Sequence, residues 1–465
     1  MATISSPTPL TPAQLAAMDV SQRRAYFASL PPDMQASQQA AWNTYRASMN
    51  RNYMRTTLRK YAVCPPQSGN ALNQAYAVAT QLTYNVPTAE NGFLEGFFVR
   101  CALTVTLGAG TTPTYALTPS APLSAIQEID VLYGNIQMRF RPYVLKYVWQ
   151  IVTYAYGGTI APSWPVIGAG GAASVMSLQH VATIDNYLGS NTSGLPSYPV
   201  AVAANTWNFE FEVPMTVLHP QDVRGMLPIM SGETTAQINI ITASAFMGND
   251  PILSPVAVTA GTGALTSVTG TVQVIAYYRD GVSLLGPARQ GLDIVGLPTV
   301  QWDIDPPLNN LLSGQVFRQK INKAENIAIG LLTIVDGIQA TKYATVANLA
   351  EIELAKDSSG TNKFWQFGLG TNIQVPEFFA EFRRVIGQDF DEGILPIMVG
   401  PIYMEPDPLM QTGIASMNTL PSGWTDINYG LQLTSVGSGL INTLACNPRV
   451  ECHLIFVNPV GLIAG

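Results

Sequence analysis

The segment Gly225-Met226-Leu227-Pro228-Ile229-Met230 recurs as a near copy, Gly393-Ile394-Leu395-Pro396-Ile397-Met398, and this recurrence indicates the fold. Each copy comes shortly after a strand-like segment that ends in Val-Pro, at Val213-Pro214 and at Val375-Pro376. Proline cannot donate a hydrogen bond to a sheet, so Val-Pro marks the end of a strand. Short motifs are weak evidence when they stand alone. The same order of features in both halves nevertheless predicts one β-sandwich design that occurs twice.

Two further features extend the repeat. Trp207-Asn208-Phe209 precedes the first copy, and Trp365-Gln366-Phe367 precedes the second. The interval between Val-Pro and the glycine is six residues longer in the second copy. Residues 376–386 within that interval open with proline, as a short helix does. We therefore expect Gly225 and Gly393 to occupy equivalent places in two superimposable domains.

Segments rich in aromatic and β-branched residues predict strands in both halves. The segments are 93–107, 136–156, 207–213, 236–241, 268–278, 325–335, 349–355, 364–375, 394–404, 427–434 and 449–457. The loops between them are long, which is typical of loops that carry function. Residues 279–300 have the composition of a connector. The predicted division is an arm at 1–75, a first sandwich at 76–290 and a second sandwich at 291–465.

The composition agrees with a large all-β protein. Charged residues make up 11% of the chain, against about 25% in ordinary globular proteins, while hydrophobic residues make up 47%. This excludes a disordered chain, because the apolar content is ample and the charge is low. It disfavours a soluble helical enzyme, whose exposed helix faces need more Glu and Lys. The surface is therefore expected to be neutral and polar, or covered by partners.

Residues 11–61 form the long region with a helical pattern, which Pro31 and Pro32 interrupt. Two stripes follow from the helical spacing: an aromatic and methionine stripe at Trp42, Tyr45, Met49 and Tyr53, and a basic stripe at Arg51, Arg55 and Arg59, with Lys60 next to it. One interpretation is a helix that packs on its own domain and keeps a solvated basic side. The other is an interfacial arm whose arginines contact lipid headgroups or nucleic acid.

The charge is unevenly divided along the chain. Residues 1–65 contain seven basic and two acidic residues, a net charge of +5. The remainder contains 16 basic and 28 acidic residues, a net charge of −12, which gives −7 for the whole. A basic arm on an acidic body predicts that the arm faces something anionic, either a membrane surface or nucleic acid.

Four cysteines in so long a chain do not make a disulfide framework. We expect buried free thiols at Cys64, Cys101, Cys446 and Cys452, and synthesis in a reducing compartment. The polar, proline-rich N-terminus lacks the pattern of a secretory signal. The longest uncharged stretch, 147–184, contains prolines and many glycines, so it is not expected to be a transmembrane helix.

The residues that could bind metal or catalyse a reaction do not converge. The three histidines, His180, His219 and His453, are far apart and lack partners at ligand spacing, so we expect isolated structural histidines. There is no nucleophile elbow and no phosphate-binding loop. The acidic groups Asp389, Asp391 and Glu392 offer oxygen ligands for Ca²⁺, although a solvated acidic turn explains them more simply, and the same applies to Asp303 and Asp305. We expect no catalytic residue, no cofactor and no metal.

With its two similar halves, its strand, Val-Pro and Gly-x-Leu-Pro pattern in each, its long loops, its low charge and its basic helical arm, the chain resembles a known family. It is similar to the double jelly-roll major capsid proteins of tailless, membrane-containing icosahedral bacteriophages, of the tectivirus and corticovirus type, which are related to the adenovirus hexon. The resemblance covers about residues 80–465 and is architectural.

The resemblance implies two tandem eight-stranded jelly-roll β-sandwiches that stand upright in a shell. Three chains would form a homotrimer of pseudo-hexagonal outline, which tiles an icosahedral virion around an internal membrane. The implied partners are the chain itself, neighbouring trimers and penton or minor capsid proteins, with an anionic membrane surface or the genome at the arm (Trp42, Tyr45, Arg51, Arg55, Arg59 and Lys60). No enzymatic activity and no small-molecule substrate are implied, and the location is the virion after synthesis in the host cytoplasm.

Other protein classes remain open from the residues alone. A phage fibre or carbohydrate-binding β-sandwich module would present exposed aromatic platforms, for which Trp164 and Trp424 are candidates, but it gives no reason for a basic arm. A polysaccharide-active enzyme needs paired carboxylates in a cleft. Glu210 and Glu212 share one side of a strand, but nothing else converges on them. An outer-membrane barrel requires a secretory signal, which the N-terminus lacks.

Overall fold

The computed structural model describes residues 9–145, 202–280, 299–367, 394–399, 428–433 and 449–458. Short gaps interrupt the first three of these ranges, at 17, 19, 57–58, 70–71, 89–91, 119–120, 135, 216–225, 230–235, 249–252, 309–313, 322–326 and 336–348. Among the described helices, none has the length and apolar character that a membrane span requires.

The first elements of the described part of the chain are three helices: α1 (Pro12–Ala16), α2 (Val20–Ser29) and α3 (Pro32–Thr56). Proline is well suited to the first position of a helix, where its missing N–H would have no partner. At the start of α1, the Gln14 backbone N–H donates to Thr11 Oγ1 over 3.3 Å, and the Thr11 N–H donates to Gln14 Oε1 over 2.9 Å. This reciprocal pair fixes the beginning of α1.

The predicted helix is wrong beyond Thr56. Residues Arg59–Val63 form strand β1, which pairs antiparallel with strand β12 (Ala264–Asp280). A continued helix would place Arg59 beside Arg55. Pairing of this segment with the 17-residue strand β12 overrides that local pattern. The expected arm at 1–75 therefore includes residues that belong to the first sheet.

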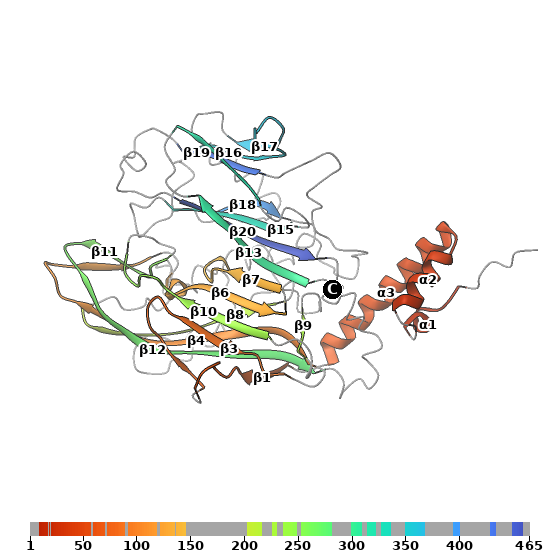
Figure 1. Ribbon diagram of the computed structural model, residues 1–465, viewed down its shortest axis with the longest axis horizontal. Coiled ribbons are helices and arrows are strands. Elements are labelled where there is room, and N and C mark those ends of the chain that lie inside the picture. The colour runs from red at the N-terminus through yellow and green to blue at the C-terminus, as the bar shows by residue number, and fades with distance from the viewer. Residues whose placement is uncertain are drawn as a thin grey trace, which may run out of the picture.

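The first jelly roll consists of two antiparallel sheets (Figure 1). One sheet has the order β1-β12-β4-β8 and the other β3-β10-β6-β7. The further strands are β3 (Gln81–Asn85), β4 (Gly92–Gly108), β6 (Ile126–Tyr133), β7 (Ile136–Phe140), β8 (Ala204–Pro214) and β10 (Ala236–Thr242). Short additions are β2 (Gln74–Ala75), β5 (Thr114–Leu117), β9 (Leu227–Pro228), β11 (Val256–Ala260) and the 3₁₀ turn η1 (Leu123–Ala125).

The second jelly roll repeats this order. Its sheets are β13-β20-β15-β18 and β14-β19-β16-β17. The strands are β13 (Thr299–Leu308), β14 (Val316–Lys320), β15 (Ile327–Val335), β16 (Leu349–Ala355), β17 (Lys363–Phe367), β18 (Ile394–Val399), β19 (Asn428–Leu433) and β20 (Arg449–Asn458). Numbered one to eight along each half, the principal strands form sheets of order 1-8-3-6 and 2-7-4-5 in both. This is the jelly-roll topology, so the predicted pair of eight-stranded jelly rolls is confirmed.

The core of each roll follows from alternation along its strands. In β4, Phe97, Val99, Cys101 and Leu103 are buried, while Arg100, Ala102 and Thr104 between them are exposed. The inner face of the second roll contains Ile352, Leu354, Tyr429 and Leu431, each at most 2% exposed. Each sandwich therefore has its own hydrophobic core, and each sheet has an outer face that points away from its partner sheet.

The repeated Leu-Pro dipeptide occupies the same place in both rolls. Across the first 1-8-3-6 sheet, one register line runs Arg59, Arg279, Phe93 and Pro228. Across the equivalent sheet of the second roll, the corresponding line runs Ile304, His453, Leu331 and Pro396. The neighbouring lines match in the same way, with Leu227 opposite Leu94 and Leu395 opposite Leu332. The duplication is thus present in the strand pairing itself.

The aromatic part of the predicted repeat is wrong. Trp207-Asn208-Phe209 lies on β8, the sixth strand, whereas Trp365-Gln366-Phe367 lies on β17, the fifth strand of its roll. The register shows that the counterpart of Trp365-Gln366-Phe367 is Met138-Arg139-Phe140 on β7, because both triplets oppose an Ile-acidic-aliphatic triplet. Alternating aromatic residues suit any strand with one buried face, so they do not identify which strand they occupy.

Candidate functional site

The two rolls meet where β7 of the first lies beside β13 of the second (Figure 1). We call this the inter-roll interface; it consists of Arg139, Phe140, Arg141 and Tyr143 on one side and Trp302, Asp303, Glu451 and His453 on the other. Phe140 and Trp302 provide its apolar part, with ring centroids 5.2 Å apart and both side chains almost fully buried. Their burial creates the low-dielectric surroundings in which the adjacent charges interact.

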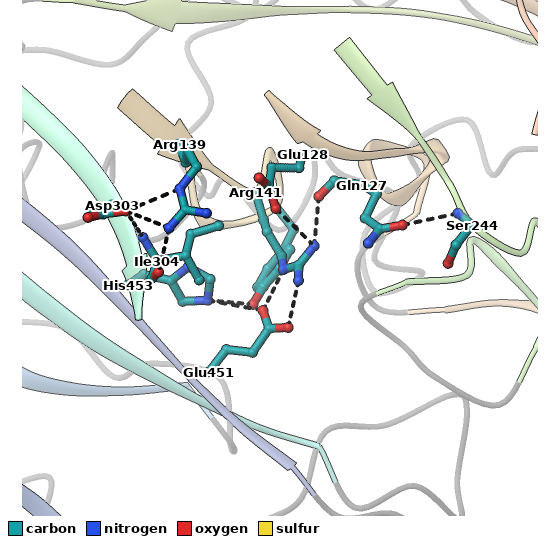
Figure 2. A network of polar contacts seen from close by, with 10 residues as sticks. Gln127, Glu128, Arg139, Arg141, Ser244, Asp303, Ile304, Glu451 and His453 are labelled. Atoms are coloured by element: carbon teal, nitrogen blue, oxygen red, sulfur yellow. Dashed lines mark hydrogen bonds and ion pairs between the residues drawn. The ribbon is translucent and has the colours of Figure 1, made fainter. Parts of the chain in front are cut away.

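A buried ion pair joins Arg141 to Glu451 at two points (Figure 2). Arg141 Nε lies 2.5 Å from Glu451 Oε2, and Nη2 lies 2.9 Å from Oε1. Arg141 also donates from Nη1 to the Gln127 carbonyl oxygen over 3.1 Å. Burial lowers the pKa of Arg141, but attraction to Glu451 and the hydrogen bonds between them more than offset this and raise it. Such a fork-to-fork pair fixes orientation as well as distance.

His453 lies beside this pair and makes a second connection between the rolls (Figure 2). The Tyr143 hydroxyl lies 2.9 Å from His453 Nε2, and the two rings meet edge to face with centroids 5.7 Å apart. His453 Nε2 is also 3.6 Å from Glu451 Oε2. The sequence predicts His453 to be an isolated structural histidine; the structure places it in a polar network.

The rim of the interface is formed by Arg139 and Asp303. Arg139 Nη2 lies 3.1 Å from Asp303 Oδ1 and donates to the Ile304 carbonyl oxygen over 3.2 Å. The Arg139 side chain is 41% exposed, so this pair contributes less than the buried one. On the adjacent β6, burial raises the pKa of both Glu128 and Asp130. The arginines of the first roll therefore have acidic groups of their own roll nearby, while the carboxylates that accept their hydrogen bonds across the interface belong to the second roll.

This arrangement can fix how the two rolls are placed relative to each other. A buried charge is costly unless a partner neutralises it, so Arg141 and Glu451 favour the one relative placement of the rolls in which they meet. Sequence reasoning missed the network, because its partners are 310 positions apart and no spacing rule connects them. It also predicted no strand around Asp303, whereas Asp303 lies on β13.

A second cluster lies where the helical arm enters the first roll. We call it the arm root; it consists of Arg59, Glu95, Glu212, Tyr277 and Arg279. Glu95 is buried between two arginines, at 2.7 Å from Arg59 Nη2 and 2.9 Å from Arg279 Nε. The Tyr277 hydroxyl donates to Glu212 over 2.5 Å, and the Arg59 guanidinium lies over the Tyr277 ring at 4.4 Å. Both carboxyl groups therefore have polar partners within the chain.

The pKa values at the arm root follow from this packing. Burial raises the pKa of Glu212, and Arg59 and the Tyr277 hydrogen bond offset only part of that shift. Burial lowers the pKa of Arg59, but its hydrogen bond and attraction to Glu95 outweigh burial and raise it. Glycine is required at Gly96, because a Cβ there would overlap the Tyr277 hydroxyl and approach the Val213 carbonyl oxygen to 2.6 Å. Val213 and Pro214 end β8 opposite this point.

The predicted arm residues separate into two groups. Trp42 is buried and stacks on Tyr45 at 5.9 Å, and the Arg23 guanidinium lies over its ring at 4.9 Å. With Leu15 and Leu30, which are also buried, they form a small core between the three helices. Arg59 and Lys60 lie on β1 instead of the helix. Arg51 and Arg55 lie on α3, and their side chains fall outside the description.

Several other predicted residues lie outside the described residues. These are Trp164, His180, His219, Gly225, Val375, Pro376, Asp389, Asp391, Glu392, Gly393, Trp424 and Cys446. Within the described part of the chain, no cluster of three His, Cys, Asp or Glu residues is arranged to hold a metal. Cys64, Cys101 and Cys452 are free and buried, as predicted.

Similar proteins are found among solved structures, whereas no protein-family model and no curated protein matches the chain. A chain of the PBCV-1 virus capsid is 9% identical and matches 86% of this chain and 93% of its own length, with a TM-score of 0.49. A chain of Sulfolobus Turreted Icosahedral Virus is 11% identical, with 87% and 92% covered and a TM-score of 0.48. The major capsid protein of bacteriophage PM2 is 10% identical, with 86% and 97% covered and a TM-score of 0.39.

In each half of the chain, the principal strands form sheets of order 1-8-3-6 and 2-7-4-5. This strand order confirms the predicted fold, which is all-β with a helical N-terminal arm. In fold, the chain is a double jelly roll.

Proposed function

We propose that this chain is the major coat subunit of an icosahedral virion and acts as a structural protein without catalysis. The observation that carries the proposal is the way in which the two rolls are joined. The fifth-strand side of the first roll contacts the outer face of the 1-8-3-6 sheet of the second. The two contacting surfaces are different, so the same contact can be repeated in one direction from roll to roll. Head-to-tail contacts of this kind close into rings when the rotation allows.

A ring of six rolls contains three chains. Around the ring of this homotrimer, the contact between the two rolls of one chain alternates with a contact between rolls of neighbouring chains. The outline is therefore pseudo-hexagonal. Tiles of this shape cover a flat facet, with penton and minor capsid proteins at the remaining positions. The low share of charged residues supports this use, because a surface that is buried by neighbours has few charges to desolvate.

The helical arm is proposed to face an anionic membrane surface inside the shell. Residues 1–58, which precede β1, contain five basic and two acidic residues, so their charge of +3 against −10 for the remainder supports this orientation. The small core around Trp42 supports an arm that is a folded unit rather than a loose tail. Arg51 and Arg55 are its assigned membrane contacts. Arg59 is not one of them, because Glu95 already pairs with it.

The coat function is tested with the purified full-length chain. Light scattering is expected to give the mass of three chains, and negative-stain microscopy is expected to show hexagonal outlines and closed shells. A chain that stays monomeric at every concentration and binds glycans would contradict the coat function and favour the carbohydrate-binding alternative.

The membrane contact is tested separately by vesicle flotation. The full chain is expected to float with phosphatidylglycerol vesicles but not with phosphatidylcholine vesicles. Arg51→Glu/Arg55→Glu is expected to abolish flotation, whereas Lys320→Glu/Lys356→Glu, which makes the same charge change in the second roll, is expected to retain it. If the full chain binds duplex DNA but does not float with vesicles, the arm contacts the genome and the proposed membrane contact is wrong.

A further inference from the structure

The outer face of the 1-8-3-6 sheet is covered in the second roll, where the first roll packs against it. In the second roll, Ile304 and His453 lie on one register line and receive Arg139 and Tyr143 from the first roll. The matching line of the first roll carries Arg59 and Arg279 at the equivalent positions. The arm root is therefore the place on the first roll that corresponds to the covered place on the second.

An aromatic surface lies at this place. Tyr61 lies on β1, two residues after Arg59 and on the same side of the strand. Its side chain is 58% exposed, more than any other large hydrophobic residue in the described part of the chain. Its ring lies 6.3 Å from both Phe98 and Tyr277, and the last two are 5.2 Å apart. Phe98 is half-buried. A large exposed aromatic side chain that continues an aromatic cluster is typical of a protein-binding surface.

The charges beneath this surface need no partner from outside. Glu95 is held by Arg59 and Arg279, and Glu212 accepts from Tyr277. The covered face of the second roll differs, because Glu451 is neutralised there by Arg141 from the other roll. The surface at Tyr61 is therefore suited to a neutral contact, since a further guanidinium would meet two arginines already in place.

The second roll offers such a neutral contact on its fifth strand. Arg139 on β7 opposes Asp130, and Gln366 on β17 opposes Glu353 in the equivalent register. Where the first roll has a guanidinium that enters the inter-roll interface, the second roll thus has an amide. Its neighbouring charges are also paired within the chain, because Lys363 contacts both Glu351 and Glu353, and Arg318 contacts Glu353.

We infer that the surface around Tyr61 binds the Gln366 side of the second jelly roll of another copy of this chain. The contact repeats the inter-roll interface between chains, with the amide of Gln366 at the position that Arg139 has in the first roll and with Tyr61 as the aromatic contact. Each roll then uses its fifth-strand side once and its outer face once, which is the condition for a closed ring. This inference rests on the proposed coat function and names the surface through which it acts.

Tyr61→Arg tests the surface, and Leu72→Arg is the matched control, because Leu72 is 57% exposed. Tyr61→Arg is expected to raise the protein concentration at which half of the trimer dissociates by about tenfold or more, because a central aromatic contact is lost. Leu72→Arg is expected to leave it unchanged. Thermal unfolding of the isolated monomers should give similar midpoints for both variants.

Proximity is tested with Tyr61→Cys/Gln366→Cys and a short bismaleimide linker. The double variant is expected to yield a covalent trimer, whereas each single variant and Leu72→Cys/Gln366→Cys are expected to remain uncoupled. Wild-type trimers without specific coupling in the double variant, and with Tyr61→Arg harmless, would overturn this surface while leaving the coat function intact. A wild-type chain that never forms trimers would overturn both.

Discussion

Arg141 and Glu451 lie 310 positions apart in the sequence and meet at two points between the jelly rolls, at 2.5 and 2.9 Å. Glu451 is fully buried and Arg141 is 8% exposed. The pair has no counterpart at the arm root, where the arginines and carboxylates of one roll neutralise each other. Within its own roll, the described carboxylate that Arg141 reaches is that of Glu128, at 4.0 Å, so the shorter two-point contact between the rolls favours the relative placement in which Arg141 and Glu451 meet.

Removal of either partner from this pair is expected to destabilise the protein strongly. Arg141→Met leaves the Glu451 carboxylate buried without its guanidinium, which costs about 3–5 kcal/mol. The measurement is the free energy of unfolding in urea. Arg141→Met/Glu451→Met is expected to recover much of this loss, because both charges are then absent.

The control for this prediction is Arg100→Ala, which breaks a 2.5 Å pair with Glu210 at a site where the arginine side chain is 45% exposed. It is expected to cost about 0.2–1 kcal/mol, as exposed pairs do. Equal losses in Arg141→Met and Arg100→Ala would contradict a special role for the buried pair.

The sequence predicts the long strands better than the edge strands. β4 and β12 alternate over many residues, so their burial pattern is visible locally. β1 and β13 begin or continue with charged residues, such as Arg59 and Asp303, whose partners come from distant segments. Those charges look like solvated positions until the fold is known. This is why β1 is predicted as helix and β13 partly as connector.

The repeat is predictable in part for a related reason. Leu-Pro marks one place in the strand pairing, because proline is tolerated only where a ladder hydrogen bond is missing. That constraint holds in both rolls, at Pro228 and Pro396. Trp365-Gln366-Phe367 carries no such constraint and belongs with Met138-Arg139-Phe140. The polar networks have no local signal at all, since their members share neither spacing nor motif.

Gly96→Ala is expected to destabilise the arm root. The added Cβ would overlap the Tyr277 hydroxyl and crowd the Val213 carbonyl oxygen, and a backbone atom cannot move aside as a flexible side chain does. Overpacking of this kind costs about 1–3 kcal/mol. The measurement is the urea midpoint of the full chain.

Gly108→Ala on the same strand is the control for Gly96→Ala. Its nearest atom would be Thr266 Oγ1 at 3.0 Å, which belongs to a side chain that can rotate. We expect a smaller loss of stability than in Gly96→Ala. A larger loss in the control would show that the space beside Tyr277 is not the limiting factor.

The buried thiols are expected to be unreactive in the native protein. Burial raises the pKa of Cys64 to about 12 and raises the pKa values of Cys101 and Cys452 as well, so the thiolate that attacks disulfide reagents is scarce. Cys446→Ser removes the remaining thiol. Titration of that variant with a disulfide reagent should detect no fast-reacting thiol in buffer and three in denaturant. A fast-reacting thiol in the native variant would contradict the buried placement of these side chains.

Glu212 is expected to make stability fall as the pH rises. Burial raises its pKa in the folded protein above the ordinary value of 4.5. Below that ordinary value the group is protonated in both states and contributes no difference. As the pH rises from there to the raised folded pKa, the unfolded chain loses the proton while the folded chain retains it, so the unfolded state gains stability.

Glu212→Gln removes this titration and keeps an oxygen that can accept the Tyr277 hydrogen bond. The variant is expected to gain thermal stability relative to wild type as the pH rises above the ordinary pKa of 4.5, and to show no gain below it. Glu210→Gln on the same strand controls for the loss of one carboxylate. A constant difference between Glu212→Gln and wild type on both sides of this pKa would mean that Glu212 keeps its charge when folded. The arginines around it would then neutralise it more completely than its burial opposes.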